Sequence, residues 1–171
     1  MKIKSGYECV DYFNEKLFMR QTGDSLICAY DKDGLLAINN VHIGNLIDGT
    51  YSLKFIIAIT NSKLLNYYYK SISLETGRVM AQTDIETVEG LPIKNITKDD
   101  QKPFIELVDK ILAITNPPSS PFNKGEQDND YLTNSTKQAK VKEYEHQIDQ
   151  IVYNLYDLNG DEINTIEGFN L

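Results

Sequence analysis

Residues 53–69 have the sequence LKFIIAITNSKLLNYYY, and Thr50 and Ser52 stand just before them. A Ser or Thr at such a position caps a helix, because its side-chain oxygen accepts a hydrogen bond from a backbone N–H of the first turn. Apolar residues then recur at helical spacing on more than one face, which is typical of a helix buried on several sides. We therefore expect one helix over 53–69, packed against a sheet.

The segments before this helix predict strands. Short apolar runs at 16–20 and 25–30 are bounded by charged or turn-forming residues. Asp-Gly within 31–34 predicts a hairpin turn, since Gly adopts positive φ at little cost. Residues 35–38 would return from that turn, and 41–47 is a further extended candidate.

The segments after the helix are more mixed. Residues 71–82 are polar and predict a loop that could end in a strand, and 85–88 is the last strand candidate. The Gly-Leu-Pro-Ile sequence at 90–93 excludes a continuing helix. Thr97–Asp100 resembles a capping box at the start of the next helix.

The C-terminal part predicts a helical hairpin. A helix over 100–114 carries apolar residues at i, i+3, i+4, i+7 and i+8, and a helix over 137–156 carries an a/d seam. The seam residues are Val141, Tyr144, Ile148, Ile151 and Leu155. A polar, proline-containing insert at 115–136 separates the two helices, and Asn159 would cap a final short helix. We therefore predict an α+β fold, in which a strand-rich recognition module with one buried helix at 1–98 precedes an antiparallel helical hairpin at 99–171.

Composition limits the function. The formal net charge is −8, of which residues 1–100 contribute −2 and residues 101–171 contribute −6. The acidic second part would repel a phosphate backbone, so any DNA contact should come from the first hundred residues. No apolar run is long enough for a membrane span, and no signal sequence follows Met1, so we expect a soluble cytoplasmic protein with Cys9 and Cys28 reduced.

Motifs for catalysis are weak. Asn116–Ser119 has the Asn-Pro-Pro of amino-methyltransferases, but Ser stands where the aromatic residue belongs and no Gly-rich cofactor loop is present. Asp157–Asp161 begins like a calcium loop and then lacks the required Gly and Glu. With two histidines and no clustered carboxylates, the sequence predicts no enzyme, no metal and no cofactor.

The basic residues of the first hundred positions are the candidates for DNA contact. An arginine fork can read guanine, while a lysine can position the phosphate backbone. The candidate residues are Arg20, Gln21, Lys63, Lys70, Arg78 and Gln82. An ordinary solvated surface explains these side chains equally well.

Four blocks of sequence together resemble a known family. They are Lys16–Asp24, Ala58–Tyr69, Gly90–Ile93 and Ile148–Leu158. In this order they are similar to the TaqI-like C-terminal specificity domain of restriction–modification enzymes, over about residues 16–167. The family usually has Leu where Thr60 stands here.

The resemblance implies DNA sequence recognition rather than chemistry. Loops of the α/β module would face the major groove of double-stranded DNA, and the following helices would connect to a methyltransferase or endonuclease domain or subunit. The alternative is a protein-interaction module or orphan remnant, whose C-terminal helices dock a partner or form a homodimer. An exposed apolar stripe on 137–156 would favour that alternative.

Overall fold

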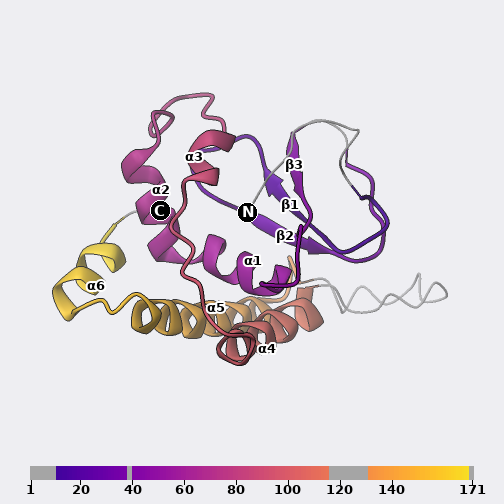
Figure 1. Cartoon of the computed structure of the whole chain (residues 1–171). Coiled ribbons are helices and arrows are strands. Elements are labelled where there is room, and N and C mark those ends of the chain that lie inside the picture. Colours follow the sequence, from indigo (N-terminus) through magenta and orange to yellow (C-terminus); the bar gives the residue numbers. More distant parts are fainter. Residues whose placement is uncertain (1–10, 38–39, 116–130, 170–171) are drawn as a thin grey trace.

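The computed structural model describes residues 11–37, 40–115 and 131–169, and these form three layers. The first layer is a three-stranded sheet, the second contains helices α1 (Leu53–Asn61) and α2 (Lys63–Ile72), and the third contains α4 (Lys98–Thr115) and α5 (Ser135–Leu155) (Figure 1). Helix α1 therefore has the sheet on one side and the α4–α5 pair on the other, which explains why nearly all of its side chains are buried.

The sheet is antiparallel with the order β2-β1-β3, so the first strand lies in the centre. Its strands are β1 (Lys16–Arg20), β2 (Cys28–Asp31) and β3 (Val41–Gly44). The expected return strand at 35–38 is wrong for the described residues 35–37, which lie in no strand. The Asp31 carboxylate accepts hydrogen bonds from the backbone of Asp33 and Leu35 and pairs with the buried Lys16, so the chain turns away from the sheet there.

The single helix expected over 53–69 is wrong, because Ser62 divides it into α1 and α2. Ser62 has extended backbone angles, its hydroxyl donates to the carbonyl of Ile59 at 2.6 Å, and it accepts from the backbone of Leu65. One side chain thus ends the first helix and caps the second. The helical periodicity continues across the break, so hydrophobic spacing alone did not reveal it.

The strand expected at 85–88 is also wrong, since α3 (Ile85–Glu89) is a short helix. The Asp84 carboxylate accepts hydrogen bonds from the backbone of Glu86 and Thr87, and the hydrogen bond from the Thr87 hydroxyl is the main reason that the pKa of Asp84 is lowered. The helix ends at Gly90, as the sequence at 90–93 predicts. A strong N-cap has therefore outweighed the β-branched composition of this segment.

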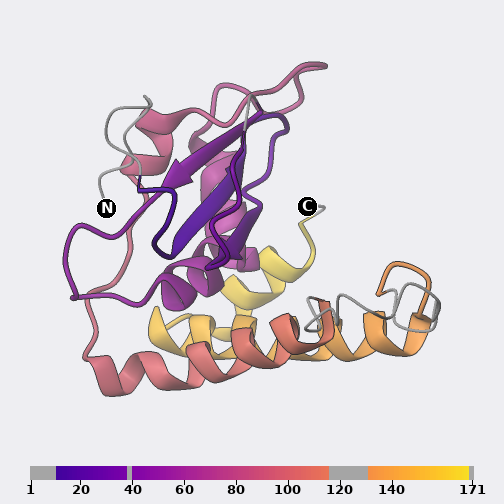
Figure 2. The ribbon, with the colours of Figure 1, turned by 90° about the vertical axis from the view of Figure 1, so that its right-hand side faces the viewer.

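The two long helices run in opposite directions and pack along each other (Figure 2). Val141 and Ile148 of the α5 seam are buried, and Tyr144, Ile151 and Leu155 are half-buried against the core. Asn159 caps α6 (Gly160–Glu167) with a complete capping box, as predicted. Most of the predicted insert at 115–136 lies outside the described residues.

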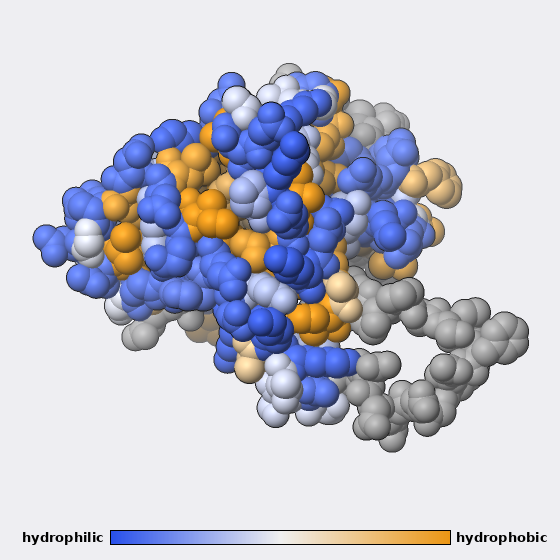
Figure 3. All heavy atoms as spheres, turned by 90° about the horizontal axis from the view of Figure 1, so that it is seen from below, coloured by the Kyte–Doolittle hydropathy of each residue, from blue (hydrophilic) through white to orange (hydrophobic). Residues whose placement is uncertain are grey.

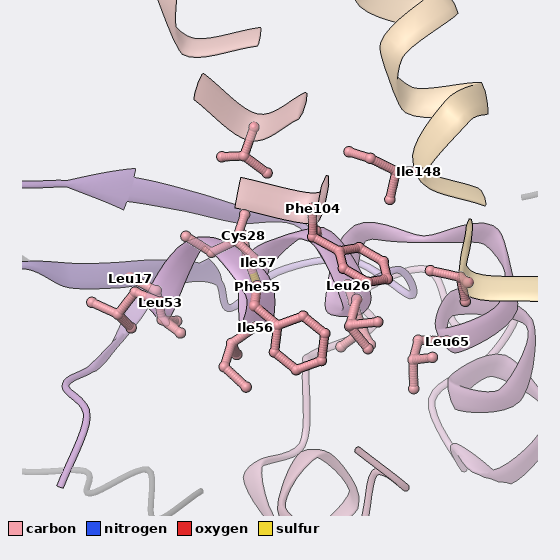
Figure 4. Packing of buried hydrophobic residues seen from close by; sticks show 14 of the residues in the cluster. Leu17, Leu26, Cys28, Leu53, Phe55, Ile56, Ile57, Leu65, Phe104 and Ile148 are labelled. Carbon is pink, nitrogen blue, oxygen red and sulfur yellow. The ribbon is translucent and has the colours of Figure 1, made fainter. Parts of the chain in front are cut away.

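The fold is α+β as predicted, but the description "strand-rich" is wrong. The strands hold only five, four and four residues, whereas α5 alone has 21. One apolar core joins sheet, α1, α4 and α5, with Leu17, Ile57, Phe104 and Ile148 among its members (Figure 4). The division of the chain at residue 98 stays a prediction.

Candidate nucleic-acid interface

Two loops lie side by side at one end of the sheet. The β1–β2 turn (residues 21–27) is hydrogen-bonded to the loop that follows α2 (residues 73–83, the 73–83 loop). Gly23 N–H donates to the carbonyl of Ala81 at 2.8 Å, and Thr83 N–H donates to the carbonyl of Gln21 at 2.7 Å. Ala81 and Thr83 are buried. The 73–83 loop is therefore fixed to the sheet at its C-terminal end.

This junction contains three of the six candidate residues, and two more lie beside it. Arg20 and Gln21 enter it from β1, and Gln82 forms an isolated β-bridge with Thr22. Lys70 is 3.8 Å from the carboxylate of Asp24 in the β1–β2 turn. Arg78 pairs with Glu75, whose carboxylate also accepts from the backbone of Gln82 at 3.3 Å.

Arg20 supports the β1–β2 turn directly. Gly23 has φ +127°, and a Cβ at this position would lie 2.4 Å from Nη2 of Arg20. The guanidinium therefore occupies the space above Gly23, and the positive φ is what favours glycine there. The Nε of Arg20 is buried and has no hydrogen-bond partner among the described residues.

The two candidate lysines differ in their surroundings. The Lys70 side chain is only 7% exposed, and its Nζ lies 6.0 Å from the ring centre of Phe169. Lys63 begins α2, roughly 10 Å away along that helix at 1.5 Å per residue. It pairs with Glu167 of α6, which also accepts from the Tyr153 hydroxyl at 2.9 Å. Lys63 thus lies at the contact of α2, α5 and α6, away from the two loops.

The outer part of the 73–83 loop projects from the body of the molecule (Figure 2). Thr76 donates from its hydroxyl to the carbonyl of Lys70 at 2.8 Å, and Gly77 makes the turn with φ +78°. Beyond this turn Val79 is 102% and Met80 is 82% exposed. Neither residue contributes to the core, so their exposure needs another explanation.

The charges around the two loops nearly cancel. The basic residues are Arg20, Lys70 and Arg78, and the acidic residues are Asp24, Glu75 and Asp84. Two of the three cations are paired with one of these acids. The locally basic face that the sequence suggested is thus close to neutral, and Arg78 is its most accessible charge, with 62% of its side chain exposed.

The block Ala58–Tyr69 has a structural role that sequence reasoning missed. The Asn61 side-chain amide exchanges two hydrogen bonds with the backbone of Cys28, at 2.7 and 2.9 Å. The Asn66 amide does the same with Leu26, at 2.8 and 3.4 Å. Leu26 ends the β1–β2 turn and Cys28 begins β2, so the two amides take the place of a neighbouring strand where the chain enters β2. They attach the C-terminal end of the β1–β2 turn to α1 and α2.

A mainly apolar cavity of about 640 Å³ lies between β2, α1, α4 and α5. Its polar lining includes Asp149, which accepts from the backbone N–H of Lys63 at 2.9 Å and whose pKa is raised by burial. Burial also raises the pKa of the Cys28 thiol to about 12, so this cysteine is an unreactive core residue.

From below, polar residues cover most of the helical layer, with apolar residues visible between them (Figure 3).

The described part of the chain contains no group of three or more His, Cys, Asp or Glu side chains placed to hold a metal ion. Within the same residues, no helix is long and apolar enough to cross a bilayer.

Comparison with known proteins supplies the family. The model of the TaqI-like C-terminal specificity domain matches residues 2–93, which is more than half of the chain. The match contains both loops and three of the four blocks that carry the resemblance, while the block at 148–158 lies outside it. No curated protein matches the chain significantly.

Proposed function

The chain belongs to the TaqI-like C-terminal specificity family, and we infer from this a role in DNA target recognition in restriction–modification systems. From this premise we propose that it is a sequence-recognition module without catalytic activity of its own, and that the β1–β2 turn and the 73–83 loop contact the target. The observation that carries the proposal is that Arg20, Gln21 and Gln82 meet at one fixed junction, with Lys70 and Arg78 beside it.

Rigidity of the two loops supports a reading function. Base-edge contacts need donors held in a defined place, because flexible groups lose conformational entropy when they bind. Two sets of hydrogen bonds fix this junction. Gly23 and Thr83 bond the two loops to each other, and the Asn61 and Asn66 amides bond the β1–β2 turn and the start of β2 to the helices. The major groove is about 12 Å wide and admits a helix or a two-stranded ribbon. The outer part of the 73–83 loop projects from the body of the molecule and is therefore placed to enter such a groove.

The electrostatics assign most of the DNA affinity to a partner. Non-specific attraction to phosphates comes from free Lys and Arg side chains, and the net charge here is −8. We therefore propose that the chain supplies sequence specificity, while a methyltransferase or endonuclease domain or subunit supplies most of the affinity for the phosphate backbone of the DNA.

A selection experiment tests this function. The full chain is purified with any methyltransferase that accompanies it, and the sample is offered a pool of random-sequence duplexes. We expect enrichment of one sequence, and Arg78→Ala should relax the preference at one base pair at a cost of roughly 1–3 kcal/mol. Lys63→Ala is the matched control and should select the same sequence. Selection of no sequence by the wild-type sample would contradict the proposal.

The alternative is a protein-interaction module that docks a partner through its C-terminal helices. This alternative would be favoured by an exposed apolar stripe on α5. The seam residues of α5 are instead buried or half-buried within this chain. The cavity beside β2 is the feature that favours it. If Ile111→Gln abolished co-purification of a partner and left DNA selection unchanged, that cavity would be a partner-docking surface in addition to the DNA-reading junction.

A further inference from the structure

The most exposed apolar side chains of the described residues include two neighbours, Val79 and Met80, at the far end of the 73–83 loop. Single exposed apolar residues are common on protein surfaces and need no explanation. Val79 and Met80 are two in succession, as are Leu35 and Leu36, but only the first pair stands on the 73–83 loop, whose C-terminal end is fixed at the junction by buried Ala81 and Thr83. The backbone holds these side chains out into solvent, where they gain nothing from folding.

Arg78, the residue beside them, carries a guanidinium whose N–H donors are not all used within the protein. Arg78 uses Nη1 to pair with Glu75, and its backbone N–H donates to the carbonyl of Glu75 at 3.1 Å. A guanidinium has five N–H donors in one plane, so several remain for a ligand. The loop thus presents a planar donor group and two apolar side chains, one after the other.

Duplex DNA offers one surface with matching chemistry. In the major groove, guanine presents the O6 and N7 acceptors that a guanidinium can bind, and thymine presents a C5 methyl group, the apolar feature of that groove. The minor groove has no methyl group. A protein surface would match this set as well, since arginine and methionine are both common in protein interfaces. The family's role in DNA target recognition is what favours the major groove.

We propose that Val79 and Met80 contact thymine C5 methyl groups in the major groove, beside a guanine contacted by Arg78. The inference rests on the proposed function and makes it more specific, since it assigns a thymine next to a guanine to the target. Val79 and Met80 are specificity residues in this view, although they carry neither charge nor hydrogen-bonding groups.

Uracil substitution tests the inference, because it removes the methyl group and leaves every hydrogen-bonding group of the base in place. The duplex selected by the wild-type sample is prepared with each thymine replaced in turn by uracil, and dissociation constants are measured with the co-purified partner present. At one or two positions we expect wild type to lose about fourfold in affinity per methyl group. Val79→Ser and Met80→Ser should each lose the uracil sensitivity at the position that the replaced side chain contacts.

Leu36→Ser is the control variant, since Leu36 is also strongly exposed (75%) and belongs to the β2–β3 connection and not to the 73–83 loop. It should retain the sensitivity to uracil. The inference alone is overturned if a sequence is selected but no uracil substitution weakens wild type, or if the selected sequence contains no thymine beside a guanine. Loss of the co-purified partner in Val79→Ser would also overturn it, because the two side chains would then belong to a protein interface. Selection of no sequence at all removes the proposed function as well.

Discussion

At the scale of single residues, side-chain amides form backbone hydrogen bonds that a neighbouring strand usually forms. Asn66 is buried, accepts from Leu26 N–H, and donates to the carbonyls of Leu26, Thr60 and Ser62. Asn66→Asp replaces the donating nitrogen by an oxygen. That oxygen, an acceptor that carries negative charge when the carboxyl is ionised, would then face the three carbonyl oxygens. We expect a loss of about 2–4 kcal/mol in the free energy of unfolding, measured by urea titration. Asn95→Asp, at an exposed position, adds the same charge and should cost under about 0.5 kcal/mol.

Asp149 gives a pH dependence of defined sign. Burial raises the pKa of its carboxyl above the ordinary value, and the hydrogen bond from Lys63 N–H only partly opposes this. The folded state therefore binds this proton more tightly than the unfolded chain does, so lowering the pH through the raised pKa stabilises the fold. Asp149→Asn keeps an acceptor for Lys63 and cannot titrate. The unfolding free energy of wild type should rise relative to this variant as the pH falls from 7 to 4, and an unchanged difference would contradict the assignment.

At the scale of elements, the sequence predicted what depends on hydrophobic spacing and missed what depends on caps. The helices α4, α5 and α6 and the central strand β1 agree with expectation, because their apolar periodicity is regular and their ends carry ordinary signals. Ser62 and Asp84 changed the outcome in the middle of the chain, and each acts through a side chain that bonds to the backbone. The junction of the two loops was not visible either, since its hydrogen bonds join residues about 60 positions apart.

The pairing of α4 and α5 can be tested at one seam position. Ile148 is buried against the core, so Ile148→Asp would place an unpaired charge there and should lower the free energy of unfolding by about 3–5 kcal/mol. Gln150→Asp adds the same side chain on an exposed position of the same helix and should cost under about 0.5 kcal/mol. The measurement is the urea midpoint of both variants. Equal midpoints would mean that the seam does not face the core in solution.

At the scale of the whole molecule, charge sets how strongly this chain alone can hold DNA. Each phosphate neutralised by a protein cation contributes about −0.9 to the slope of log affinity against log salt. Near the two loops Lys70 and Arg78 already face acids, and only Arg20 has no ion-pair partner among the described residues. We therefore expect a shallow slope of about −1 for the chain alone between 50 and 200 mM salt, and a steeper one with the co-purified methyltransferase. Arg78→Ala should relax the base preference and leave the slope nearly unchanged, because its proposed contact is a base edge. Lys63→Ala should change neither, because Lys63 faces Glu167. A slope steeper than about −4 for the isolated chain would show that a larger cationic surface binds the backbone, and DNA affinity would then belong to this chain rather than to its partner.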